Sequence, residues 1–420
     1  MGATRQAIAA DQLAKLRALL AALRPANQFY TRKLAAVGAL DGVSSLAEFT
    51  AQIPFTTKAE LVADQVAHSP YGSNLTFPIA EYTRCHQTSG TSGAPLRWLD
   101  TPQSWQAMVD SWKTVLRAAD VQPGDRVLFA FSFGPFLGFW LAFEAAAQMG
   151  CLCFPGGGLS SVTRLRLLLE NRVTVLCCTP TYALRLAEVA AQEKLDLRQS
   201  AVQKLLVAGE PGGSIPALRE RLQTLWLGAR VFDHHGMTET GPVTFQSAEH
   251  DDSLQVMESD YFAEVVDPVT GAAVDAGQTG ELVLTTLTRT ASPVLRYRTG
   301  DLVRLVPGTS PMRLAGGILG RADDMVIIRG VNVHPAAVDQ ILRQFPEISE
   351  YRVCISSNGA MAELRVQVEL AVASTLNTAH IAEAFRVGLN LRVPVELVPA
   401  QSLPRFELKA ARWIRESSHD

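Results

Sequence analysis

The sequence predicts an α/β protein: a large N-terminal domain with parallel sheets covered by helices, a small β subdomain within it, and a smaller α+β domain at the C-terminus. Its 420 residues exceed one ordinary domain. Between residues 104 and 233, wholly apolar strand-like runs alternate with helical patterns, which is typical of a parallel sheet covered on both faces. After the charged, turn-like run 320–324 the pattern becomes that of a compact unit of about a hundred residues. We therefore expect domains at 1–320 and 325–420, joined at 321–324.

The chain is 47% hydrophobic and 19% charged, a composition that can bury large cores and argues against disorder. Its formal net charge of −3 gives no electrostatic case for nucleic acid as a partner. The uncharged and strongly apolar run 127–143 is broken by Gly134-Pro135 and ends at Glu144. This favours a buried strand, a loop and a helix over a membrane span.

The first ten residues lack the pattern of a signal peptide, and the cysteine pairs 151/153 and 177/178 sit in apolar runs. Buried free thiols in a reducing cytoplasm are the simplest interpretation. No cysteine occurs between 245 and 320, so we expect no structural zinc there.

Hydrophobic spacing places an amphipathic helix before Pro25, and Thr57 with Glu60 predicts the start of another helix. In the alternating region we expect helices at 105–119, 136–149, 161–171, 181–193 and 214–225, and strands at 126–131, 151–154, 173–178, 204–208 and 230–233. The β subdomain should hold strands at 263–266, 280–286, 293–297 and 302–305. The C-terminal unit should hold strands at 325–328, 352–356, 364–370 and 395–398, and helices at 335–345 and 381–389.

The stretch Thr88–Pro95 crowds hydroxyl residues and glycines together, which suits a loop around an anion better than a strand or helix. Glycines let backbone N–H groups converge on phosphate oxygens, and hydroxyls add donors. A flexible surface turn remains the alternative, and no lysine follows Gly93 as in the GxxxxGK[ST] loop. Two further loops, 208–211 and 233–239, follow predicted strands, where ligands of parallel sheets bind.

Five ordered segments together resemble the acyl-adenylate-forming superfamily, and most closely its phenylacetate–CoA ligase group. They are 88–95, 235–239, 297–301, 320–324 and 403–409. The resemblance covers nearly the whole chain. It implies an ATP- and Mg²⁺-dependent enzyme that joins a carboxylic acid, most consistently an aromatic one, to AMP and then transfers the acyl group to coenzyme A. It also implies a C-terminal domain that rotates between the two steps.

The resemblance assigns roles residue by residue. The phosphate loop would comprise Thr88, Ser89, Gly90, Thr91, Ser92 and Gly93. The adenine would lie among Gly209, Glu210, Pro211, His235, Gly236 and Met237, with Asp301 on the ribose and Arg321 on ribose or phosphate. Glu239 would bind Mg²⁺, Thr238 the α-phosphate, and Lys409 both the substrate carboxylate and the α-phosphate, with Asp323 as the hinge. The acyl group would face Phe136, Ala208, His235 and Gly236.

Two residues depart from the family pattern. Ala94 stands where relatives commonly carry a lysine, which predicts weaker ATP binding or slower pyrophosphate formation. His235 stands where many have an adenine-stacking tyrosine; it could stack on adenine, face the acyl pocket, or be structural.

Two other functions stay open at this point. An adenylating enzyme could pass the acyl group to a carrier-protein pantetheine or an amine. A ligand-binding relative without turnover is the other, supported only by Ala94 and His235. We expect small-molecule partners (acid, ATP and CoA), no membrane, and leave a homodimer open.

Overall fold

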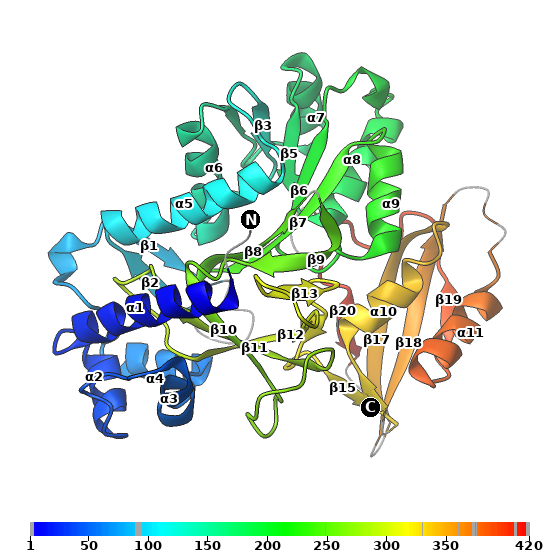
Figure 1. Cartoon of the computed structure of the whole chain (residues 1–420). Coiled ribbons are helices and arrows are strands. Elements are labelled where there is room, and N and C mark those ends of the chain that lie inside the picture. Colours follow the sequence, from blue (N-terminus) through cyan, green and yellow to red (C-terminus); the bar gives the residue numbers. More distant parts are fainter. Residues whose placement is uncertain are drawn as a thin grey trace.

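The computed structural model describes residues 4–88, 95–247, 249–329, 331–358, 361–371, 374, 376–406 and 410–416. An eight-stranded sheet in the order β13-β9-β8-β7-β6-β5-β3-β4 forms the upper part of the molecule in Figure 1. Its strands are β3 (Arg126–Phe129), β4 (Leu152–Pro155), β5 (Val175–Cys178), β6 (Lys204–Val207), β7 (Arg230–Met237), β8 (Gly241–Ser247), β9 (His250–Val256) and β13 (Arg313–Ala315). The run from β4 to β7 is parallel, as predicted. The antiparallel continuation through β8 and β9 was not predicted.

Helices cover both faces of this sheet. They are α5 (Pro102–Ala118), α6 (Leu137–Gln148), α7 (Ser161–Glu170), α8 (Pro180–Gln192) and α9 (Pro216–Leu225), with a short 3-10 turn η2 (Leu197–Gln199). Side chains alternate across a strand, so Val127 and Phe129 of β3 join the core formed with α5 and α6, whereas Leu128 joins the core formed with α7, α8 and α9. The predicted two-faced α/β core is confirmed.

The N-terminal helices pack against the small β subdomain. The elements are α1 (Arg5–Leu23), α2 (Gln28–Ala35), α3 (Leu46–Gln52), α4 (Lys58–Ala67), η1 (Ile79–Glu81), β1 (Arg84–Gln87) and β2 (Arg97–Asp100). Their core includes Leu295 and Tyr297 of the subdomain. Thr57 and Glu60 form the predicted capping box at the start of α4.

The subdomain is a four-stranded sheet in the order β10-β11-β12-β14. Its strands are β10 (Tyr261–Val266), β11 (Thr279–Thr286), β12 (Tyr297–Arg304) and β14 (Gly320–Arg321). The prediction of separate strands at 293–297 and 302–305 was wrong, because Gly300 lies inside β12, where the register against β11 shifts. Gly300 has φ +78°, and a Cβ there would lie 2.6 Å from Arg321 Nη2, so the glycine serves a bulge rather than a strand end.

The C-terminal unit has a core of its own and lies beside the upper sheet and the subdomain (Figure 1, yellow to red). Its elements are β15 (Val326–Ile328), β16 (Val331–Val333), α10 (Pro335–Leu342), β17 (Ile348–Asn358), β18 (Met361–Leu370), α11 (Thr378–Leu389), β19 (Val395–Leu397) and β20 (Trp413–Glu416). The order β19-β18-β17-β20 includes β20, which the sequence did not predict. Across the described residues, no helix combines the length and apolarity needed to cross a membrane.

Candidate active site

Three residues predicted to bind the nucleotide meet at one edge of the two sheets. Asp301 on β12 is 5% exposed. Its Oδ2 lies 2.9 Å from His235 Nε2 at the end of β7, and its Oδ1 accepts a hydrogen bond from Arg321 Nη1 of β14 at 3.1 Å. Segments more than sixty residues apart therefore converge on one carboxylate.

Arg321 also holds the predicted hinge residue. Its Nε and Nη2 donate to the two oxygens of Asp323 at 2.8 and 3.0 Å. Burial opposes the charge of Arg321, but Asp323 and Asp301 more than offset it and raise the pKa of the guanidinium. Burial likewise opposes the charge of Asp323, but Arg321 keeps the pKa of that carboxyl below its ordinary value. The proposed hinge thus begins with a bidentate ion pair between Arg321 and Asp323.

Glu239, the predicted metal ligand, is 6% exposed and lies in the turn after β7. The Tyr297 hydroxyl donates to its Oε1 at 3.4 Å, and Lys58 Nζ lies 3.9 Å from the same oxygen. Thr56 bridges to Tyr297 of β12, which brings the first residue of α4 to the site. Lys58 was missed as a site residue, because in the sequence it is only the residue after a helix cap.

Thr238 is held through its backbone by Arg289, which was also missed. Arg289 is 1% exposed and donates from Nη1 to the Thr238 carbonyl oxygen at 2.7 Å. It pairs with both carboxylate oxygens of Asp100 at 2.8 and 2.6 Å. The turn that carries Thr238 and Glu239 is thereby fixed to a buried ion pair. No local pattern distinguishes this arginine in the sequence.

The remaining residues of the 235–239 segment are set by the hairpin. A Cβ on Gly236 would lie 2.7 Å from the Gly241 carbonyl oxygen, so only glycine fits there. Met237 is partly buried and packs against the core of the N-terminal helices. His234, next to His235, is buried, and burial lowers its pKa to about 4 while its Nδ1 lies 2.7 Å from the Thr244 carbonyl oxygen.

The predicted phosphate loop begins beside the predicted acyl loop. Thr88 closes the base of the loop, because its N–H donates to the Leu96 carbonyl oxygen at 2.9 Å and its hydroxyl oxygen accepts from the Leu96 N–H at 3.0 Å. The N–H of Gln87 donates to the Pro135 carbonyl oxygen at 2.9 Å, next to Phe136, the partly buried N-cap residue of α6. The loop residues Ser89, Gly90, Thr91, Ser92 and Gly93, and Ala94 after them, lie outside the described residues.

The loop after β6 carries the other predicted adenine contacts. Ala208 is partly buried, and Gly209 and Pro211 are exposed. Glu210 directs its carboxylate to protein groups: Oε1 accepts from the Thr181 N–H at 2.8 Å and Oε2 from the Ala410 N–H at 3.1 Å. Lys409 lies outside the described residues.

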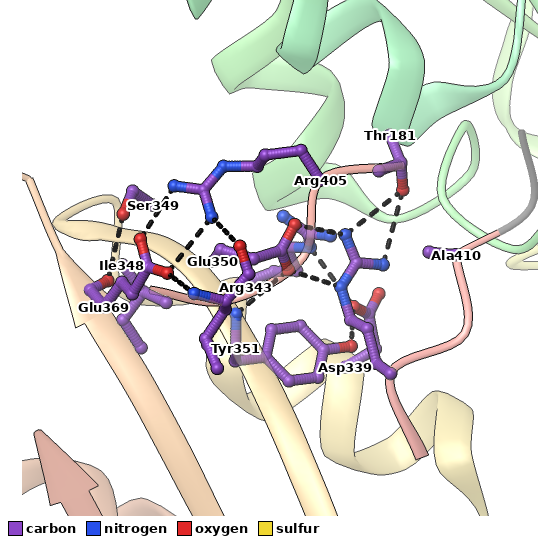
Figure 2. Close-up of polar contacts among 12 residues, drawn as sticks. Thr181, Asp339, Arg343, Ile348, Ser349, Glu350, Tyr351, Glu369, Arg405 and Ala410 are labelled. Atoms are coloured by element: carbon purple, nitrogen blue, oxygen red, sulfur yellow. Dashed lines mark hydrogen bonds and ion pairs between the residues drawn. The ribbon is translucent and has the colours of Figure 1, made fainter. Parts of the chain in front are cut away.

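The C-terminal unit meets the main sheet around the start of α8 (Figure 2). Arg412 is 8% exposed, pairs with Glu350 at 2.6 Å and reaches the Thr181 hydroxyl oxygen at 3.4 Å. Its guanidinium also lies over the Tyr351 ring, 4.9 Å from the centroid. The partly buried carboxylate of Glu210 and the buried guanidinium of Arg412 thus tie residues 410–412 to the main sheet and the start of α8.

A second arginine enters this interface from the segment before Lys409. Arg405 pairs with Glu369 at 2.7 Å within the C-terminal unit (Figure 2). It also lies 3.4 Å from Glu188 of α8. Arg221 of α9 donates to the Ile348 carbonyl oxygen at 2.9 Å. The described residues on both sides of 407–409 therefore contact α8 or its neighbouring loop.

Comparisons with known proteins show the family to which the chain belongs. The model of the AMP-binding enzyme family matches residues 87–288, and the model of the AMP-binding enzyme C-terminal domain matches residues 330–416. A phenylacetate-coenzyme A ligase of Pseudomonas putida is 32% identical over 424 aligned positions, covering 97% of this chain and 94% of the relative.

Solved structures of a 2-hydroxyisobutyryl-CoA ligase are also similar. In its postadenylation state with 2-HIB-AMP, it matches with TM-score 0.92 and 29% identity over 99% of this chain and 91% of its own. In its thioesterification state with 2-HIB-AMP and CoA, it matches with TM-score 0.73 and 31% identity over 98% and 90%. The relative placement of the two domains here is therefore more similar to that in the postadenylation structure than to that in the thioesterification structure.

The fold and the comparisons together define an adenylate-forming enzyme with two domains. The chain belongs to the family of AMP-binding enzymes, and within it to the AMP-forming acid–coenzyme A ligases of the phenylacetate–coenzyme A ligase type. It uses ATP and Mg²⁺ to convert a carboxylic acid to the acyl-AMP, and coenzyme A accepts the acyl group.

Proposed function

We propose that the reaction takes place at the sheet edge where Asp301, His235 and Arg321 meet, and that the preferred acid is aromatic. The observation that carries the site is the buried Asp301 carboxylate with one partner on each oxygen. Each carboxylate oxygen has two lone pairs, so ribose hydroxyls can still donate to Asp301. In this role His235 orients the carboxylate of Asp301, which favours a structural role for His235 over stacking on adenine.

The metal would be held by Glu239. Mg²⁺ on a triphosphate usually takes one or two protein carboxylates and keeps several waters. Within the described residues there is no cluster of three or more metal-ligating side chains, which suits a metal that enters with the nucleotide. When bound, Mg²⁺ would neutralise phosphate charge. Lys58, 3.9 Å from Glu239, adds a cation at the same place. Thr238 would contact the α-phosphate.

Lys409 would act during adenylation. Attack of the carboxylate on the α-phosphorus builds negative charge on the equatorial oxygens, and a positioned ammonium stabilises that charge more than it stabilises the ground state. The docking of Ala410, the next residue in the chain, against Glu210 supports this role.

The aromatic preference rests on Phe136 beside the start of the phosphate loop and on the name of the Pseudomonas putida relative. The competing acids are small aliphatic ones, since a structural neighbour binds 2-HIB-AMP. A carrier-protein pantetheine or an amine are competing acceptors.

We place the enzyme in the cytoplasm, because its six cysteines are all free. We place the hinge at 321–324, with domains 1–320 and 325–420, and a homodimer is the competing assembly to a monomer.

Pyrophosphate exchange over a panel of phenylacetate, benzoate, 2-hydroxyisobutyrate and octanoate tests the acid. We expect phenylacetate or benzoate to give the highest kcat/KM, and a preference for 2-hydroxyisobutyrate or octanoate would contradict the proposal. AMP release with CoA, a pantetheinylated carrier protein or an amine as sole acceptor tests the second step, and turnover only without CoA would contradict it. ATP binding without exchange for any acid would point to a non-turnover relative. Light scattering on the purified chain measures its assembly.

A further inference from the structure

We propose that Glu210 is a positioning residue for adenylation: its carboxylate anchors the backbone next to Lys409 to the N-terminal end of α8. The inference rests on the proposed role of Lys409 in adenylation. It assigns Glu210 a task other than contact with adenine.

Glu210 is held by the start of α8. Thr179 caps α8 and Pro180 is its first residue, so Thr181 carries one of the first free N–H groups of the helix. This N–H donates to Glu210 Oε1 at 2.8 Å. A carboxylate at a helix N-terminus is favoured by the helix dipole, so Glu210 is fixed in one orientation by the N-terminal domain alone.

This orientation leaves the other carboxylate oxygen of Glu210 free to accept a bond from the C-terminal unit. The other oxygen, Oε2, accepts from the Ala410 N–H at 3.1 Å, across two hundred residues of sequence. Hydrogen bonds to an ionised acceptor are stronger than neutral ones. Ala410 directly follows Lys409 in the chain, so this bond holds the described residue that adjoins the lysine.

Residues on both sides of 407–409 also contact α8 or the groups around its start. On the C-terminal side, Arg412 bridges Glu350 of β17 and the Thr181 hydroxyl, so the same helix start contacts the segment twice (Figure 2). On the other side of 407–409, Arg405 pairs with Glu369 and lies 3.4 Å from Glu188 of α8. Glu210 is the member of this set that bonds to the residue adjoining Lys409.

Glu210 bonds to Thr181 within the N-terminal domain and to Ala410 of the C-terminal unit, so the second bond forms only when the domains are placed as in this structure. A residue that orders Lys409 in this arrangement should affect acyl-AMP formation and leave later acyl transfer largely intact. A residue that contacts adenine should affect ATP binding in both steps.

The test measures both half-reactions of the full chain for Glu210→Ala and Glu210→Gln. Pyrophosphate exchange with the best acid of the panel reports the first, and CoA thioester formation from the chemically prepared acyl-AMP reports the second. We expect Glu210→Ala to lower the kcat of exchange by about tenfold or more, with the KM for ATP and the second half-reaction within about threefold of the parent. Glu210→Gln retains one acceptor oxygen, so its kcat of exchange should lie between those of Glu210→Ala and the parent.

Two control variants separate positioning from general effects. Glu193→Ala removes an exposed carboxylate after the other end of α8 and should match the parent. Arg221→Ala removes the bond to the Ile348 carbonyl, an interdomain contact that involves none of residues 410–412, and should lower exchange less than Glu210→Ala does. The second half-reaction also serves as the check that each variant is folded.

Several results would overturn the inference. They are an unchanged exchange rate in Glu210→Ala, a rise in the KM for ATP alone, an equal loss in both half-reactions, or the same loss in Arg221→Ala. Lys409→Ala separates the proposed role of Lys409 from that of Glu210. If Lys409→Ala exchanges as fast as the parent, its proposed role fails; if it loses exchange while Glu210→Ala keeps it, only the role of Glu210 fails.

Discussion

The two sides of the candidate site are built in different ways. On the nucleotide side, His235 and Asp301 lie on β7 and β12 of the N-terminal domain, and Arg321 lies on β14, which pairs with β12 where the proposed hinge begins. On the lysine side, Ala410 and Arg412 reach Glu210 and Thr181 from another core, over sequence separations of 200 and 231 residues. The first side is present whenever the N-terminal domain is folded. Because the second joins two separate hydrophobic cores, we expect it to be assembled by docking and to come apart without unfolding either domain.

The largest effect should come from Arg412, whose ion pair belongs to the docked side. Arg412→Met leaves Glu350, which is 5% exposed, without its cation in a buried position. An unpaired buried charge costs about 3 kcal/mol or more. We therefore expect the free energy of unfolding of the C-terminal domain, measured with urea, to fall by that amount. The double variant Arg412→Met/Glu350→Leu should recover much of the loss. Arg386→Met, in the exposed pair with Glu383, is the control and should leave the transition unchanged. A parent-like Arg412→Met would mean that the pair is not buried in solution.

The next effect belongs to the nucleotide side. Asp301→Ala removes the proposed ribose acceptor and leaves His235 and Arg321 without their shared partner. We expect about a hundredfold loss of kcat/KM in both half-reactions, because the nucleotide is bound in both. Asp275→Ala, exposed in the same subdomain, is the matched control. A loss in only one half-reaction would contradict the idea that this side is permanent.

Acid should weaken the N-terminal domain through His234. Its folded pKa of about 4 lies below the ordinary value of 6.5, because burial disfavours the charged ring. Between these values the unfolded chain binds the proton and the folded chain does not, so stability falls as pH drops. From about pH 7.5 to about pH 5 this amounts to about 2 kcal/mol, measured by urea unfolding. His234→Asn should be less stable at neutral pH but show a shallower pH dependence. An identical slope in the variant would assign the effect to other groups.

The smallest effect concerns Lys58, which stands beside Glu239. Lys58→Ala should raise the KM for ATP by about tenfold, which corresponds to about 1.4 kcal/mol, because a cation near the phosphates is lost. Ala94→Lys, which restores the residue common in relatives, should reverse part of this rise in the double variant. If Lys58→Ala binds ATP as the parent does, Lys58 only pairs with the free carboxylate. Equilibrium binding of a nonhydrolysable ATP analogue provides the measurement.

The sequence predicted the regular part of the fold because its signals are local. The apolar runs around Val127 and Leu176 and the cap at Thr57 depend on neighbouring residues only. The division of β12 was wrong because the pair Gly300-Asp301 reads locally as a turn, whereas the bulge depends on a partner strand.

The site was predictable where a resemblance supplied the partners. Asp301, Arg321 and His235 were placed in one site by ordered motifs, and the structure brings them into contact. Lys58 and Arg289 were missed because their importance comes from Glu239 and Thr238, which they meet only after folding. The second partner of Glu210, Ala410, likewise depends on how two domains dock.

The most direct test of the difference between the two sides is the ratio of the two half-reaction rates in Glu210→Ala and Asp301→Ala, measured side by side. We predict that Asp301→Ala lowers both rates and keeps their ratio near that of the parent. Glu210→Ala should lower the ratio of acyl-AMP formation to thioester formation by about tenfold. Equal ratios in the two variants would contradict the claim that one side of the site is built in and the other is assembled by docking.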